Sequence, residues 1–216
     1  MTLLSVWQII RAYFHVDAAQ GFGKDIETLQ HPRIDLISIS GHKIYGPKGI
    51  GALIVRRRGF RRPPLTPLLY GGGQERGLRP GTLPVPLIVG LGVAAELALR
   101  EARHRAKICQ AFRERTLAAL APLDPIINGD SRRTLPHVVN LAFPGIDAEA
   151  VMVAVKDYIA ISNGSACTSH NYEPSHVLKA MRLPDIIIQS ALRLSWCHMT
   201  PDPDWDAVVN IIRKLR

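Results

Sequence analysis

The sequence predicts an α/β protein: a mostly parallel sheet with helices on both faces, followed by a smaller α+β domain. Three observations predict this class. Residues 1–90 alternate short strands with turn-rich connections, and the segment 36–40 is apolar in character on both faces, as in a strand covered from both sides. A long helical pattern then precedes a second set of strands and helices. We therefore expect two domains, at residues 1–95 and 96–216.

The first domain is expected to contain three strands. Apolar runs bounded by turn residues predict them at residues 13–17, 36–40 and 50–56. The stretch 63–86 is rich in proline and glycine and is expected to be largely loop. From about residue 87 to residue 120 the sequence is rich in Ala, Leu, Glu and Arg, which favours a long helix.

The second domain is expected to mix strands and helices. Strands are expected near residues 138–142, 160–162 and 192–197. Helices are expected near residues 147–155, after Pro174, and from about residues 202–206 to the C-terminus. Acidic residues at the start of that last helix and Arg213 near its end suit the helix dipole.

Composition limits the class of protein. Of the 216 residues 47% are hydrophobic and 21% are charged, which is typical of a packed globular protein. No apolar run approaches the ~18 residues of a membrane span, and the apolar segment 3–14 is interrupted by Gln8 and Arg11, so we expect neither an anchor nor a signal peptide. Three cysteines do not suggest a disulfide framework and fit a reducing cytoplasm.

The net charge of +9 is partly local, because five arginines lie between Arg56 and Arg62. Two interpretations stay open. A basic run of this kind attracts nucleic acid or an acidic protein partner, or it is a solvated strand end and loop. No recognisable nucleic-acid-binding motif accompanies it.

The most informative segment is the one that follows the predicted strand 36–40. It places Ser40, His42 and Lys43 at the strand's C-terminal end, where an open α/β sheet binds its ligand. A lysine can form a Schiff base there, whereas a lone lysine at such a position is more often an exposed residue in a surface turn. Asp17 ends the preceding strand. A carboxylate and a lysine at two strand ends match the needs of pyridoxal phosphate, whose ring nitrogen is held by an acid and whose aldehyde is carried by an amine.

A second chemical feature lies far downstream. The loop 163–169 consists of small residues and presents one thiol, Cys167, which we identify as the candidate nucleophile. The alternative for any free cysteine is a buried structural thiol. That alternative suits Cys109 within a helix and Cys197 on an apolar strand, whereas the polar loop around Cys167 is unlike a core strand.

Together these segments resemble the cysteine desulfurases, pyridoxal-phosphate enzymes of the class V aminotransferase fold. The resemblance covers nearly the whole chain. Desulfurases of this type are roughly twice as long, so the chain resembles their C-terminal half: the C-terminal part of the large cofactor-binding domain and the small domain that carries the cysteine loop. The matching segments are HVDAAQ (15–20), SGHKIYGPKGIGAL (40–53), GGGQERGLRPGTLPV (71–85), NGSACTS (163–169) and ALRLS (191–195).

The resemblance implies roles for the residues around the lysine. Lys43 would bind the cofactor aldehyde covalently and, with His42, serve as acid and base. Asp17 would pair with the pyridinium nitrogen, and Gln20 would hydrogen-bond the ring's phenolic oxygen. Ser40 and His42 would hold the phosphate. Turn capping is the ordinary alternative role for a serine in this position.

The resemblance also implies a substrate and partners. Arg193 would bind the substrate carboxylate, and Thr82 would reach the cofactor phosphate of a second subunit, which implies a homodimer. Cys167 would take sulfur from L-cysteine as a persulfide, leave L-alanine, and pass the sulfur to an acceptor protein. No standing metal site is expected; in desulfurases that serve iron–sulfur assembly, the loop cysteine transiently touches a nascent cluster.

The expected activity is therefore cysteine desulfurase, serving iron–sulfur cluster assembly or DNA phosphorothioation. Two alternatives stay open. One is a selenocysteine lyase or aminotransferase on the same fold. The other is a truncated, non-catalytic remnant that acts as a partner-binding module.

Overall fold

The computed structural model describes residues 12–163 and 175–216, and it confirms the α/β class. The chain divides into two compact units, Met1–Ala102 and Arg103–Arg216. The helix α3 (Val85–Leu120) is continuous and contributes residues to both units. The domain boundary expected after residue 95 and this division both fall inside α3.

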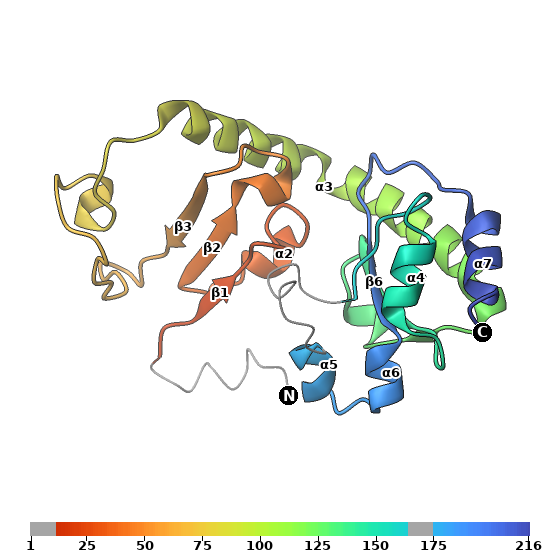
Figure 1. Cartoon of the computed structure of the whole chain (residues 1–216). Helices are drawn as coiled ribbons and strands as arrows, with labels where there is room; N and C mark the ends of the chain where they lie inside the picture. The colour runs from red at the N-terminus through yellow and green to blue at the C-terminus, as the bar shows by residue number, and fades with distance from the viewer. Residues whose placement is uncertain (1–11, 164–174) are drawn as a thin grey trace. The chain divides into compact units, whose positions relative to one another are not determined.

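The first unit contains a three-stranded sheet in the order β1-β2-β3 (Figure 1). Its strands are β1 (His15–Asp17), β2 (Leu36–Ser40) and β3 (Gly51–Val55). β2 has the predicted bounds, and the other two lie within the predicted ranges. In the register, Asp17 lies opposite Ser38, and Ser40 lies opposite Gly51.

The strand directions correct one detail of the prediction. β1 and β2 are parallel, but β2 and β3 are antiparallel, so the described strands form a mixed sheet rather than a mostly parallel one. The reason lies in the connections. A parallel neighbour needs a crossover of a dozen or more residues, and the ten residues 41–50 between β2 and β3 form a tight turn that reverses the chain.

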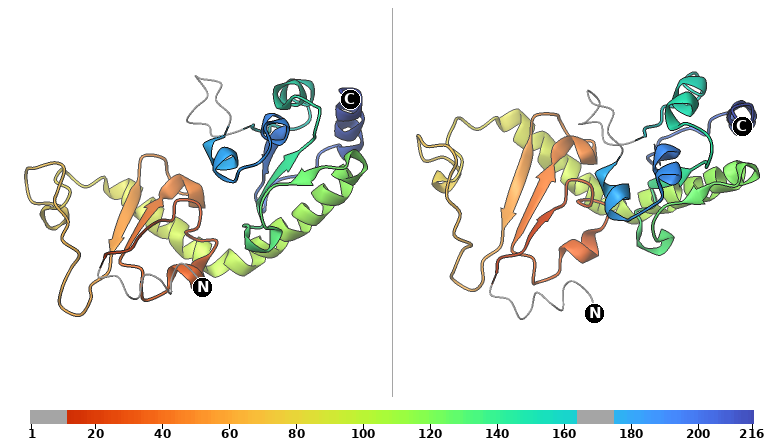
Figure 2. Two further views of the ribbon diagram at one scale, coloured as in Figure 1. Left: turned by 90° about the horizontal axis from the view of Figure 1, so that it is seen from below. Right: turned by 60° about the horizontal axis from the view of Figure 1, so that its bottom comes forward.

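One face of this sheet packs into an apolar cluster. Its buried members are Ala18, Ile34 and Ile37, and the short helix α2 (Ile26–Leu29) adds Leu29. Figure 2 shows β1, β2 and β3 side by side from two further directions. Because side chains alternate along a strand, the other face of the sheet carries the polar side chains of β1 and β2.

The second unit is an antiparallel sheet in the order β4-β5-β6, packed with helices. Its strands are β4 (Ile126–Ile127), β5 (Val138–Ala142) and β6 (Ala191–Ser195). Its helices, besides the C-terminal half of α3, are α4 (Ala148–Ala154), α5 (His176–Ala180), α6 (Asp185–Gln189) and α7 (Trp205–Arg213). The predicted α+β architecture is confirmed for this half.

The core of the second unit joins strands and helices in one cluster. β5 and β6 contribute Leu141 and Leu192, both fully buried, against Phe112 of α3, Val151 of α4 and Val208 of α7. Carboxylate caps fix the helix starts. Asp147 Oδ1 accepts from the amides of the first turn of α4, and Asp204 Oδ1 accepts from the Ala207 amide of α7 at 2.9 Å.

The strand expected at residues 160–162 is reduced to one bridge, between Ser162 and Arg193. Three further elements, α2, β4 and α6, were not predicted from the sequence. Each of these elements has only two to five residues, which is too short for a hydrophobic period to show.

Candidate cofactor site

Two parallel strands end at the same edge of the sheet in the first unit, and polar side chains follow both. β1 ends at Asp17, and the Ala18 amide continues the ladder by donating to the Ser38 carbonyl at 2.9 Å. The Asp17 side chain is exposed, and its Oδ1 accepts from the Ala19 amide at 3.0 Å. That bond holds one oxygen of the carboxylate at the strand end.

The lysine lies in the turn that follows the neighbouring strand. A 3₁₀ turn, η1 (Gly41–Ile44), begins directly after Ser40 and carries exposed His42 and Lys43. Ser40 Oγ and His42 Nδ1 are 3.1 Å apart, within hydrogen-bond distance. Ile44 anchors the end of the turn, since it is buried against Ala94 and Ala98 of α3. Burial of Ile44 thus fixes the end of the turn, while the side chains of His42 and Lys43 are exposed to solvent.

Glycines make this turn possible by close backbone packing. A Cβ on Gly51 would lie 2.5 Å from the Ile39 carbonyl oxygen, and one on Gly41 would lie 3.0 Å from the Ile50 carbonyl oxygen. A Cβ on Gly46 would likewise lie 3.0 Å from the Gly41 carbonyl oxygen. Any side chain at these positions would push the β2–β3 connection apart, and Lys43 lies in that connection.

The structure adds two residues that sequence reasoning missed. His15 Nε2 lies 2.7 Å from Ser38 Oγ, joining β1 to β2. His15 precedes Asp17 by two residues, and Ser38 lies opposite Asp17 in the register. Strand alternation therefore puts both on the polar face that leads to the candidate site. The period-two spacing of His15 and Asp17 was the available signal.

Three further predicted residues lie elsewhere. Gln20 is exposed in the turn three residues after β1. Thr82 is exposed in the loop before α3, and that loop is closed by the Gly81 amide, which donates to Gln74 Oε1 at 3.0 Å. Cys167 lies outside the described residues. The first unit therefore brings Asp17, Ser40, His42 and Lys43 to one sheet edge.

Arg193 belongs to the second unit. It lies on β6 between buried Leu192 and Leu194, and its own side chain is exposed. Its amide donates to the Ser162 carbonyl at 2.6 Å, and the Ser162 amide donates back at 3.2 Å. Ser162, close to the end of the first described range, is thus paired with the strand that carries Arg193.

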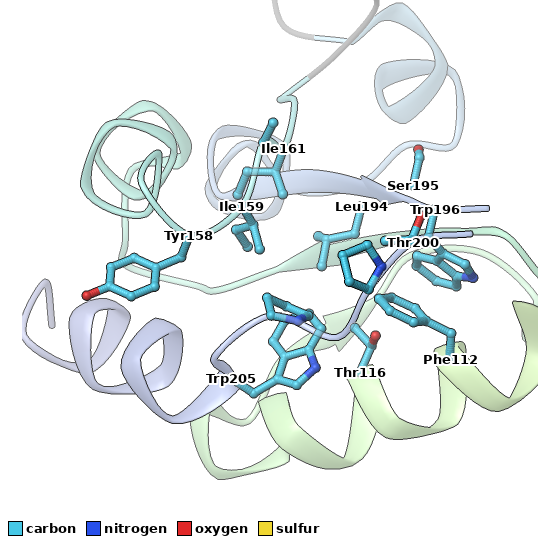
Figure 3. Close-up of a pocket in the computed structure, with 13 residues that line it drawn as sticks. Phe112, Thr116, Tyr158, Ile159, Ile161, Leu194, Ser195, Trp196, Thr200 and Trp205 are labelled. Carbon is cyan, nitrogen blue, oxygen red and sulfur yellow. The ribbon is translucent and has the colours of Figure 1, made fainter. Parts of the chain in front are cut away.

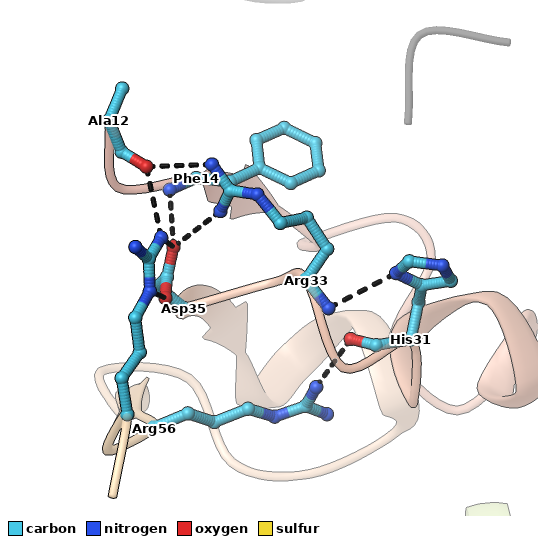
Figure 4. Close-up of polar contacts among 7 residues, drawn as sticks. Ala12, Phe14, His31, Arg33, Asp35 and Arg56 are labelled. Atoms are coloured by element: carbon cyan, nitrogen blue, oxygen red, sulfur yellow. Dashed lines mark hydrogen bonds and ion pairs between the residues drawn. The ribbon is translucent and has the colours of Figure 1, made fainter. Parts of the chain in front are cut away.

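The basic run has a structural role in part. Arg58 binds buried Asp35, and Arg56 donates to the carbonyls of Leu29 at 2.7 Å and His31 at 2.8 Å. Figure 4 shows the contact between Arg56 and His31. Neither guanidinium is therefore a freely solvated group, whereas Arg57, Arg61 and Arg62 are exposed. Two arginines of the run therefore bind the segment between α2 and β2, and the other three are exposed to solvent.

Neither a membrane helix nor a metal centre is evident in the part of the chain that the structure describes. None of the described helices is both long and apolar enough to cross a bilayer. Within residues 12–163 and 175–216, no three His, Cys, Asp or Glu side chains gather as metal ligands.

Comparisons with known proteins place the chain in one family. Two relatives are the cysteine desulfurase IscS of Rickettsia massiliae (strain Mtu5) and the mitochondrial cysteine desulfurase of Arthroderma benhamiae (strain ATCC MYA-4681 / CBS 112371). The first is 46% identical over 202 residues, 93% of this chain and 48% of the relative. The second is 44% identical over 205 residues, 94% of this chain and 40% of the relative. The chain spans about half the length of the curated relatives it matches.

Solved structures agree. DndA from Streptomyces lividans is 46% identical and has a TM-score of 0.76, covering 90% of this chain and 55% of that one. A NifS-like protein from Rickettsia africae ESF-5 is 29% identical with a TM-score of 0.80, covering 98% and 55%. The family described as aminotransferase class-V matches residues 3–208. The chain therefore belongs to the class-V aminotransferase family.

Proposed function

We propose that this chain carries the lysine, the acidic partner and the sulfur-accepting cysteine of a pyridoxal-phosphate-dependent cysteine desulfurase. The main support for this proposal is that β1 and β2 are parallel and end at the same edge of the sheet. Asp17 and the turn that contains Lys43 therefore lie at that same edge. The homologous desulfurases support this assignment.

The residues at this edge suit the cofactor's chemistry. When bound, pyridoxal phosphate supplies a ring that withdraws electrons from the substrate α-carbon. Lys43 offers a primary amine for its aldehyde, and Asp17 offers a carboxylate for its ring nitrogen. Ser40 and His42 offer a hydroxyl and an imidazole to its phosphate, and Gln20 offers an amide to its ring oxygen. All of these side chains except Ser40's are exposed, so they are accessible to a ligand.

The proposed reaction moves one sulfur atom. L-cysteine and the Cys167 thiol become L-alanine and a Cys167 persulfide: the Cys167 sulfur bonds to the substrate sulfur, and the substrate's Cβ–S bond breaks. The substrate Cβ takes a proton in place of the sulfur and becomes the methyl group of L-alanine. Lys43 would move protons at the α-carbon, with His42 as a second acid–base group. Arg193 would hold the substrate carboxylate through its planar guanidinium, for which its exposure is suitable.

Partners follow from the same assignment. The persulfide would be passed to a sulfur-acceptor protein in iron–sulfur assembly or DNA phosphorothioation, and in the former case Cys167 would transiently touch a nascent cluster. Thr82, exposed in its loop, would serve the cofactor phosphate of a second copy in a homodimer. The small number of cysteines, three in 216 residues, suits a reducing cytoplasm.

Cofactor capture tests the lysine. The purified chain is incubated with pyridoxal phosphate and reduced with borohydride, and the pyridoxyl adduct is located by peptide mass mapping. We expect the adduct on Lys43, lost in Lys43→Ala and retained in Lys48→Ala. Lys48 is the matched control, because it is an exposed lysine in the same β2–β3 connection. Labelling spread evenly over surface lysines would reject the assignment.

Sulfur capture tests the cysteine separately. With ³⁵S-labelled L-cysteine, we expect reductant-sensitive label on the protein, lost in Cys167→Ser and kept in Cys197→Ser. Cys197 is a suitable control because it is a second, only partly buried cysteine. Undiminished sulfide release from Cys167→Ser, with cofactor still bound, would contradict the desulfurase mechanism.

A further inference from the structure

A tight turn in the first unit, residues 58–61, carries much of the basic run. The Arg58 amide donates to the Arg61 carbonyl at 2.9 Å, and the Arg61 amide donates back at 3.2 Å. Gly59 and Phe60 therefore form the tip of the turn. Gly59 has a φ of +60°, which glycine adopts readily at the first position of a two-residue hairpin loop. The arginines are thus carried on an ordered backbone.

The turn is anchored on both sides of its tip. Before the tip, Arg58 Nε and Nη2 donate to buried Asp35, and its guanidinium lies 4.8 Å from the centre of the Tyr13 ring. After the tip, Pro63 is buried. Because the backbone is already held in place, little of its conformational entropy is left to lose when the tip binds another molecule.

The aromatic ring at the tip lies in a different environment from the rings of the core. Phe60 has an exposed fraction of 102%, so the described chain does not cover it. In the second unit, by contrast, the Phe112 ring centroid lies 5.3 Å from that of Trp196 and 6.4 Å from that of Trp205 (Figure 3). Phe60 adds nothing to a core of that kind, so its ring is available for contact with another molecule.

Positive charge accompanies this ring. The side chains of Arg57, Arg61 and Arg62 are exposed, and the sequence contains no Asp or Glu from residue 56 to residue 74. Asp35, the carboxylate beneath the turn, already accepts hydrogen bonds from Arg58 and Arg33. The sequence pI of about 9.9 points the same way. A concentration of positive charge of this kind attracts polyanions.

The ring and the charges together favour a single-stranded nucleic acid. Such a strand offers phosphates to arginines and unpaired base faces to an aromatic ring. An anionic membrane fits less well. Phe60 is the one apolar residue between residues 56 and 62, and stable membrane attachment takes a larger apolar surface. An acidic protein surface would satisfy the arginines but brings no base to stack on the ring.

We propose that the 58–61 turn and its flanking arginines bind single-stranded nucleic acid without sequence preference. A base stacks on Phe60, and the guanidinium groups of Arg57, Arg61 and Arg62 contact phosphates. This surface uses neither the lysine nor the cysteine of the proposed desulfurase, so the proposal is tested independently of that function.

Fluorescence anisotropy with the full chain measures the binding. The probe is a labelled oligothymidylate of about 12 nucleotides, which lies within the site sizes of single-strand-binding domains. The comparison ligand is the same oligonucleotide annealed to oligoadenylate, whose bases stay paired and stacked. We expect saturable binding of the single strand in low salt that weakens as salt is added.

Variants at the tip test base stacking. Phe60→Ala should weaken single-strand binding by about 5-fold or more, the value of one base–aromatic stack, and should change duplex binding by less than about 2-fold. Phe60→Trp keeps an aromatic face and should retain the affinity for the single strand. Because Phe60 is fully exposed, neither substitution removes packing from the fold.

Salt dependence tests the arginines. Each phosphate contact on a single strand contributes about 0.7 to the slope of log affinity against log salt. Arg57→Gln and Arg62→Gln should each reduce the slope by that amount. Arg132→Gln is the charge-matched control, because Arg132 is exposed in the second unit and its Nε lies 3.1 Å from Asp130 Oδ1. It should leave the slope unchanged.

Three outcomes would overturn the proposal. The first is no binding of the single strand in low salt. The second is a Phe60→Ala variant that keeps its single-strand affinity, or that loses single-strand and duplex affinity equally. The third is displacement of the oligonucleotide by polyglutamate or by phosphatidylserine vesicles at equal charge concentration, which would assign the turn to an acidic protein or to a membrane surface.

Discussion

Arg58 donates two hydrogen bonds to Asp35, from Nε to Oδ1 at 2.6 Å and from Nη2 to Oδ2 at 2.7 Å. Asp35 is only 2% exposed, and it immediately precedes β2. Arg33 Nη1 and the Phe14 amide also donate to Oδ2, at 2.8 Å and 2.7 Å (Figure 4). A buried carboxylate is stable only with such partners. The pair thus ties the start of β2 to the segments before β1 and after β3.

Removing the charge at Asp35 should loosen the first unit. For Asp35→Asn we expect a loss of about 2–3 kcal/mol in the opening free energy of β2, because charge-assisted hydrogen bonds from two arginines are lost. Native-state hydrogen exchange of the β2 amides measures this energy. Asp25→Asn is the control, since Asp25 makes no side-chain cap bond on α2. Equal effects of the two variants would contradict the assigned role.

The same carboxylate predicts an acid-dependent stability. Hydrogen bonding from Arg58 is the main reason that the Asp35 pKa lies below its ordinary value of 3.8. In the acid range the unfolded state therefore binds more protons, so this contribution is fully present above about pH 4 and is lost as the pH falls through the folded-state pKa. The stability difference between wild type and Asp35→Asn should shrink between about pH 4 and pH 2. A constant difference from pH 6 to pH 2 would refute the coupling.

The sequence predicted local features of this unit well and long-range ones poorly. The bounds of β2 followed from an apolar run between turn residues, and the positions of Asp17 and Lys43 followed from where strands end. The partner of Asp35 could not be predicted in that way, because Arg58 is 23 residues away and the pair forms only when β3 lies beside β2.

The same limit applies to the candidate site. His15 and Ser38 meet because β1 and β2 share a register, which no local pattern specifies. The direction of β3 was likewise set by the short connection through η1 rather than by its own apolar pattern. Motif spacing predicted candidate residues that the structure places at one sheet edge, whereas their supporting contacts depend on tertiary packing.

The basic run should separate into structural and exposed arginines. Arg56→Met removes hydrogen bonds to the carbonyls of Leu29 and His31, at the end of α2. We expect it to lower the stability of the first unit by about 1–2 kcal/mol. Arg61→Met replaces an exposed side chain and should change stability by less than about 0.5 kcal/mol. Hydrogen exchange at residues 29–31 and in β2 provides the readout; a larger effect from Arg61→Met than from Arg56→Met would reverse the assignment.

The first residue of β3, Gly51, should tolerate no side chain. An added Cβ would meet the Ile39 carbonyl oxygen at 2.5 Å, a backbone atom that cannot rotate away. We expect Gly51→Ala to destabilise the first unit by about 1–3 kcal/mol through overpacking, and to lower the yield of any Lys43 adduct because the turn is displaced.

Gly92→Ala is the matched control for that substitution. Gly92 lies within α3, and an added Cβ there meets nothing within 4 Å. Because alanine favours a helix more than glycine does, this variant should gain up to about 1 kcal/mol. Hydrogen exchange and borohydride labelling of the two variants, compared at equal protein concentration, give the answer. If Gly51→Ala kept wild-type stability and labelling, close packing of β2 against β3 would not be what positions the lysine.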